Sequence, residues 1–194
     1  MENVWKTITT WLTENSVTEF VELNAGVTEN EIKALEEIIN TKLPQDFINF
    51  YKIHNGQTAY ADYGLIDFQE LLSFERIAEI WSGWNDVLNG ATVDNTSNPE
   101  SGIKDNWWNP LWIPVTASAD GDVICIDLDP AEEGTKGQII EVYHDDDIRI
   151  LAANSFTEWI KRYAEKFEHG KMVFSESFGI TDKETLKLME EEAE

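Results

Sequence analysis

The stretch from Trp112 to Leu128 places the strongest constraint on the fold, because its pattern predicts a β-hairpin. Asp120 and Gly121 form the turn signal, since glycine readily adopts the positive φ that a tight hairpin turn requires. The second arm, Val123–Leu128, is almost continuously apolar and rich in β-branched residues, so we expect both of its faces to be covered. A strand covered on both faces belongs at the centre of a sheet.

Helical patterns come before this hairpin, and further strand patterns follow it. Helices are predicted over Glu2–Glu14, after a Thr28–Glu31 capping box, after Pro44, from Ser73 to Gly90, after Ser155 and from Thr181. Strands are predicted over Gln138–His144 and Ile148–Ala152, with a shorter one over Leu65–Phe68 and a short irregular or extended link over Gly170–Gly179. This order predicts an α+β domain with an antiparallel central sheet of about four to six strands flanked by helices.

The charge of the chain is strongly unbalanced: 38 acidic and 14 basic residues give a formal net charge of −24. A phosphate backbone would be repelled by such a field, so the composition argues against direct binding of nucleic acid. Two interpretations of the acidity stay open. It serves solubility, or it steers a basic protein partner toward the surface.

Cys125 is the single cysteine, and it lies in the middle of the predicted central strand. One cysteine cannot form a disulfide within the chain, which favours a reducing compartment. Met1–Thr10 lacks the basic start and apolar run of a signal peptide, and no stretch reaches the length of a membrane span. We therefore expect a soluble, cytoplasmic protein that does not bind a membrane.

No pattern in the sequence predicts catalysis. The carboxylates from Asp120 to Glu133 offer many oxygens, but the order of an EF-hand fails because Ile124 and Cys125 replace its acidic residue and its glycine. The three histidines lie far apart, and a thiol within an apolar strand is typically an inert core group. We predict no catalytic residue, no cofactor and no metal ligand. A metal-dependent hydrolase that uses the Asp120–Glu133 carboxylates is the alternative from another class.

Two kinds of residue are candidates for binding a protein partner. The first kind is tryptophan, a frequent interface anchor, at the end of a long polar loop predicted over Ala91–Asn106. Adjacent residues of an extended segment face opposite ways, so one of the two tryptophans after the loop is expected to be exposed. The second kind is acidic residues gathered in turns at strand ends. The candidates are Trp107, Trp108, Asp120, Asp122, Asp145, Asp146 and Asp147. Whether they share one side of the sheet stays open at this point.

Several segments, in a fixed order, resemble the SUKH superfamily, the family of the yeast cell-wall-assembly regulator. They are Gly26–Glu29, Glu31–Glu36, Leu43–Tyr51, His54–Gln57, Leu71–Ile77, Trp112–Val115, Asp120–Asp122 and Ser155–Ile160. No single motif is specific, and the ordered set carries the resemblance. The two ends of the chain lie outside it. We expect an N-terminal helical extension over 1–25, a single SUKH-like domain over 26–169 and an acidic, partly helical C-terminal extension over 170–194.

The resemblance implies an α+β fold without enzymatic activity and with no fixed catalytic or ligand set. Bacterial members are mostly immunity proteins of polymorphic or contact-dependent toxin systems, often against nucleases, and fungal members act as regulatory scaffolds of cell-wall synthesis. An acidic inhibitor can occupy the basic surface that a nuclease offers to its substrate. We therefore expect an immunity protein whose partner is a basic toxin domain, and a cell-wall regulatory scaffold is the alternative. The oligomeric state stays open.

Overall fold

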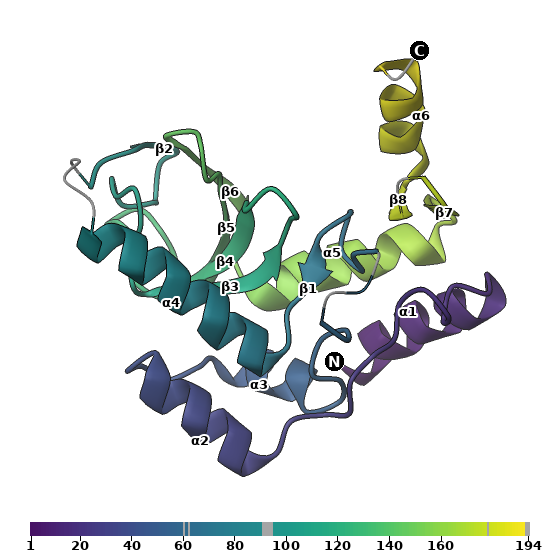
Figure 1. Ribbon diagram of the computed structural model, residues 1–194, viewed down its shortest axis with the longest axis horizontal. Coiled ribbons are helices and arrows are strands. Elements are labelled where there is room, and N and C mark those ends of the chain that lie inside the picture. The colour runs from purple at the N-terminus through teal and green to yellow at the C-terminus, as the bar shows by residue number, and fades with distance from the viewer. Residues whose placement is uncertain (60, 62, 91–94, 178, 193–194) are drawn as a thin grey trace.

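The computed structural model describes residues 1–59, 61, 63–90, 95–177 and 179–192 (Figure 1). Its helices are α1 (Glu2–Glu14), α2 (Glu29–Ile38), α3 (Gln45–Tyr51), α4 (Phe74–Gly90), α5 (Phe156–Glu168) and α6 (Lys183–Glu192). Its strands are β1 (Glu70–Leu71), β2 (Asn98–Pro99), β3 (Trp112–Ala117), β4 (Val123–Asp127), β5 (Gln138–Val142), β6 (Ile148–Ala153), β7 (Met172–Ser175) and β8 (Gly179–Asp182). Residues 91–94 of the loop predicted over Ala91–Asn106 lie outside the described residues.

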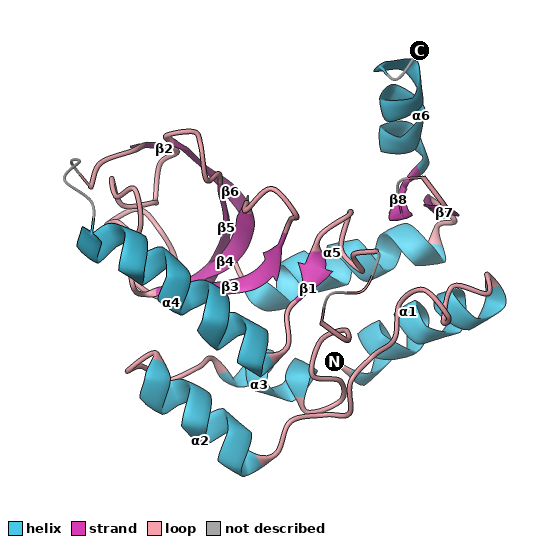
Figure 2. Cartoon of the chain, in the orientation of Figure 1, coloured by secondary structure: helices cyan, strands magenta, loops and turns pink. Residues whose placement is uncertain are grey.

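The main sheet has the strand order β1-β3-β4-β5-β6-β2, so β4 lies inside the sheet, as its apolar pattern predicts. β3, β4 and β5 pair antiparallel, and Cys125 stands opposite Pro114 on one side and Ile140 on the other. Figure 2 shows α4 crossing in front of β3 and β4, while α5 runs behind β1. The α+β class and the mostly antiparallel sheet flanked by helices are confirmed.

Two helix starts show how local sequence fixes the elements. The Thr28 hydroxyl accepts a hydrogen bond from the Glu31 amide, and the Glu31 carboxylate accepts one from the Thr28 amide at 2.6 Å. This is the predicted capping box, which satisfies amides that a helix leaves unpaired at its start. At α5 the Ser155 hydroxyl caps the Glu158 amide, but the Glu158 carboxylate accepts from the Asn154 amide instead of from Ser155. At α5, therefore, only one of the two hydrogen bonds of a capping box forms.

Two predicted segments were wrong, and a third is more regular than predicted. The strand predicted over Leu65–Phe68 is absent from that segment, and β1 pairs with β3 two residues later. Asp67 and Phe68 have φ values of 42° and 71°, a left-handed conformation that an extended strand cannot contain. The irregular or extended link predicted over Gly170–Gly179 is extended over β7 and contributes to the β7–β8 hairpin. The polar loop before Trp107 contains β2, which pairs parallel to β6 and makes the sheet mixed.

Gln57 organises the segment that leads into β1. Its side-chain oxygen accepts hydrogen bonds from the amides of Leu65 at 2.7 Å and Leu71 at 3.0 Å, and its side-chain nitrogen donates to the Tyr63 carbonyl at 2.8 Å. Gln57 is only 1% exposed, so its side-chain amide forms these hydrogen bonds away from water. One buried amide thus shapes an irregular segment that has no helix or strand of its own.

The C-terminal helix α6 stands clear of the rest of the chain (Figure 1) and contacts β8. Its Leu188 side chain is exposed. Among the described residues, no helix combines the length and the apolar character needed to cross a membrane.

Candidate functional site

The two acidic turns predicted from sequence meet at one end of the sheet. The β3–β4 turn and the β5–β6 turn become neighbours because β4 pairs with β5, with Val123 opposite Val142. The Asp122 carboxylate accepts hydrogen bonds from both the backbone amide and Nδ1 of His144, each at 2.9 Å. The Asp145 carboxylate lies 3.9 Å from the same Nδ1. These contacts bring Asp122 and Asp145, 23 positions apart in the sequence, to one histidine.

The electrostatic environment of His144 makes a direct prediction. The hydrogen bond that His144 Nδ1 donates to Asp122, helped by the nearby charge of Asp145, raises the pKa of the His144 imidazole above its ordinary value. A raised folded-state pKa favours the folded state most at low pH, and that contribution fades as pH rises through the folded-state pKa. In an NMR titration of the imidazole we expect a midpoint above about 6.5. Asp122→Asn should move this midpoint down, and an unchanged midpoint would show that the ion pair does not exist in solution.

The two adjacent tryptophans have different environments. Trp107 is half-buried, whereas Trp108 is fully buried and stacks on Trp84 of α4 with 4.8 Å between ring centroids. The two side chains therefore differ in burial, but Trp107 is only partly exposed because it also packs against the core. Because Trp108 has no exposed surface, it cannot touch a partner directly, and it leaves the set of candidate contact residues as a core residue.

Arg149 of β6 connects Trp107 to the second acidic turn. Its guanidinium lies 4.9 Å from the centre of the Trp107 ring and donates to the Trp107 carbonyl at 2.7 Å. It also donates to the carbonyls of Asp146 and Ile148 at 2.7 and 2.6 Å. The residue has no exposed surface. Sequence alone does not single out this arginine, although a cation inside the apolar run Ile148–Leu151 is a signal that could have done so.

A groove of about 850 Å³ lies beside these turns, between α4 and the sheet; we call it the α4 groove. Its α4 side is formed by Ile80, Gly83, Trp84 and Val87. Its other lining residues include Tyr63, Phe68, Glu70, Arg76, Glu79, Trp107, Ala117, Gly121, Val123 and His144. Trp107 and the β3–β4 turn, both predicted as parts of a binding surface, thus border the same hollow. The α4 face itself was predicted only as core.

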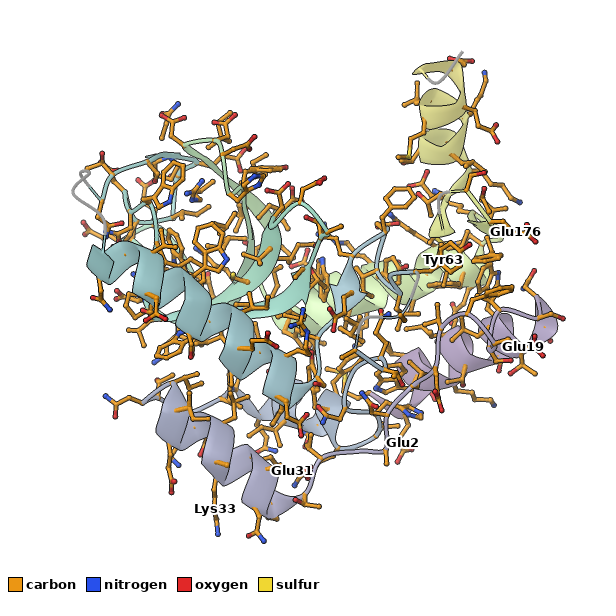
Figure 3. The ribbon with its side chains drawn as sticks, in the orientation of Figure 1. Glu2, Glu19, Glu31, Lys33, Tyr63 and Glu176 are labelled. Carbon is orange, nitrogen blue, oxygen red and sulfur yellow. The ribbon has the colours of Figure 1, made fainter. Side chains whose placement is uncertain are left out.

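One wall of the α4 groove is tied to the C-terminal hairpin. The Tyr63 hydroxyl donates to the Glu176 carbonyl at 2.8 Å, and Figure 3 shows the two residues close together. The Tyr63 ring also meets Phe174 of β7 edge-on, with centroids 5.1 Å apart. A segment outside the predicted core domain therefore helps to hold the groove wall.

The carboxylates proposed for the hydrolase alternative serve separate contacts. Asp127 is buried and accepts a hydrogen bond from the side-chain nitrogen of Gln138 at 2.8 Å, while Asp129 pairs with Lys104 at 2.6 Å. In the described part of the chain, the group of three potential ligand atoms lying within 4.8 Å consists of Asp122, His144 and Asp145. Of these three residues, only Asp122 belongs to the Asp120–Glu133 carboxylates of the hydrolase alternative.

Cys125, predicted to be an inert core residue, is fully buried. Burial, reinforced by the charge of Asp127, raises the pKa of its thiol well above the usual value. A thiol in this environment is a poor nucleophile, because the reactive form is the thiolate.

The fold and the groove define an α+β domain with an apolar hollow flanked by acidic turns. The chain belongs to the SMI1 / KNR4 family (SUKH-1), whose family model matches residues 26–162. The resemblance inferred from the ordered segments is confirmed.

Fungal relatives match beyond the family region. The chain is 26% identical to a glucan synthesis regulatory protein of Neurospora crassa, over 96% of this chain and 41% of that protein. It is 27% identical to the cell wall biosynthesis/cell cycle regulator smi1 of Schizosaccharomyces pombe, over 89% and 37%. It is 23% identical to the cell wall assembly regulator SMI1 of Saccharomyces cerevisiae, over 86% and 40%. The chain thus spans about two fifths of the length of these relatives.

Proposed function

We propose that this chain is a non-catalytic protein-binding module that docks a partner in the α4 groove and regulates it. The observation that carries the proposal is the position of an apolar groove, lined by Trp84 and Trp107, beside the acidic turns. Aromatic side chains that keep part of their surface accessible are common anchors of protein interfaces, and surrounding charges steer the partner. The names of the fungal relatives favour a regulatory role in cell-wall synthesis. We place this role in the cytoplasm, as the single cysteine favours a reducing compartment.

The second candidate is the immunity protein predicted from sequence, with a basic toxin domain as its partner. The acidic turns and the net charge of −24 favour it, because they complement a basic surface. Both candidates use the same groove, and they differ in the identity of the partner.

The test compares the proteins that co-purify with tagged wild type and with two tagged variants, each expressed in the organism that encodes the chain. Gly83 lines the groove, whereas Gly90 is the last residue of α4 and is not a lining residue. A Cβ added at either position would meet no atom within 4 Å. We expect Gly83→Trp to lose a partner that wild type and Gly90→Trp both recover in quantitative mass spectrometry. A cell-wall synthesis protein supports the regulatory role, and a toxin domain supports immunity. Equal recovery by all three proteins would contradict docking in the groove.

A further inference from the structure

We infer that the occupant of the α4 groove is a segment of a partner protein that carries apolar side chains next to lysine or arginine. The inference rests on the proposed function and adds the chemistry of the partner. It follows from the surfaces that the described residues leave in the groove and from the charges around them.

The α4 side of the groove supplies the apolar contact. Ile80, Trp84 and Val87 are spaced four and three residues apart, so they line one face of the helix. Val87 is 59% exposed, and Ile80 and Trp84 are only partly buried. Covering such a strip removes apolar surface from water, which favours a partner with apolar side chains of its own.

Carboxylates flank this strip from two separate elements. On one side Arg76 is paired with both Glu70 at 3.2 Å and Glu79 at 2.5 Å. On the other side His144 lies between Asp122 and Asp145, with Asp120 exposed in the same turn. Among the described lining residues, Arg76 and His144 therefore each lie beside two carboxylates, and these carboxylates attract an incoming lysine or arginine from both sides.

The position of these features on separate elements of one groove favours a polypeptide over a small molecule as the occupant. The two acidic clusters belong to the β1–α4 region and to the sheet end, and the apolar strip of α4 lies in the same groove. A chain that presents side chains at regular intervals can place apolar groups on the strip and cations at its flanks. Amphipathic segments that dock in apolar grooves use this arrangement.

The test is selection of binders from a random peptide library displayed on phage, using the full chain as bait. Binders are counter-selected on Gly83→Trp and retained on Gly90→Trp, so that the selected peptides depend on the groove. We expect the survivors to be enriched in apolar residues next to lysine or arginine. The dissociation constant of a synthesised survivor should rise at least about tenfold for Gly83→Trp, because the new indole fills the part of the groove in which the peptide binds.

Charge is tested on the same peptide. Asp120→Asn combined with Asp145→Asn should weaken binding about threefold to tenfold at low salt, with the loss shrinking as salt rises. Glu37→Gln combined with Glu190→Gln removes the same charge from exposed positions away from the groove and should change little. Survivors that are neutral or acidic would overturn this inference and leave groove docking intact. A library without any groove-dependent survivor would overturn both.

Discussion

Replacing Trp5 with alanine is expected to lower the free energy of unfolding by about 3–5 kcal/mol, a large part of the stability of an ordinary domain. Trp5 is 2% exposed, and its ring stacks on Phe50 of α3 with centroids 4.5 Å apart. Its indole nitrogen donates to the Phe50 carbonyl at 2.9 Å. The substitution therefore removes a large buried ring and one of the two hydrogen bonds that the Phe50 carbonyl accepts, the other coming from the Ile53 amide at 3.2 Å. Chemical denaturation followed by far-ultraviolet circular dichroism measures the change.

Trp5→Phe separates the two contributions. It keeps most of the ring contact and loses one hydrogen bond to a carbonyl that keeps another, so it should cost about 0.5–1.5 kcal/mol. The result bears on domain organisation, because Trp5 lies outside the family match over residues 26–162. A loss below about 1 kcal/mol for Trp5→Ala would show that the predicted N-terminal extension contributes little to the stability of the domain.

Gln57→Leu is expected to cost at least about 2 kcal/mol, since it leaves two buried amides without partners at about 1–3 kcal/mol each and removes a hydrogen bond from a partly buried carbonyl. Leucine fills a similar volume, so the loss reports hydrogen bonding rather than a cavity. The affected groups are the amides of Leu65 and Leu71 and the carbonyl of Tyr63. Because Tyr63 lines the α4 groove, the same variant should also weaken any peptide that binds there.

Gln45→Leu is the matched control for this prediction. Gln45 is exposed at the start of α3 and bonds only Asn49 among the contacts described, so its replacement should change stability by less than about 0.5 kcal/mol. Thermal unfolding of both variants distinguishes the two outcomes. Equal midpoints would mean that the segment from Tyr63 to Leu71 holds its shape without Gln57.

Local patterns predicted the elements whose signals are contained within a few residues. The Thr28–Glu31 box, the Asp120–Gly121 turn and the apolar β4 strand each depend on neighbours in sequence. Pairing between distant segments left no such signal. β2 joins the sheet through a parallel partner some fifty residues away, and its sequence, Asn98–Pro99, has little strand character.

The candidate site was predicted in part for the same reason. Clustered aspartates and adjacent tryptophans are visible in the sequence, so the acidic turns and Trp107 could be proposed. The groove itself depends on how α4 lies against β3, which is a property of packing. The Ile80–Trp84–Val87 strip looks like core in sequence, because periodicity indicates an apolar face without showing how completely it is covered.

The packing of α1 against α5 has a consequence for how the protein is made. Thr7 donates to Glu168 at 2.9 Å across a separation of 161 residues, and Trp11 meets Phe167 edge-on. Contacts of such separation slow folding, because a long loop must close before they can form. Since α1 leaves the ribosome long before α5, part of its apolar face stays uncovered until α5 has been made. During synthesis that face is an open target for chaperones, although in the finished fold it lies inside the molecule.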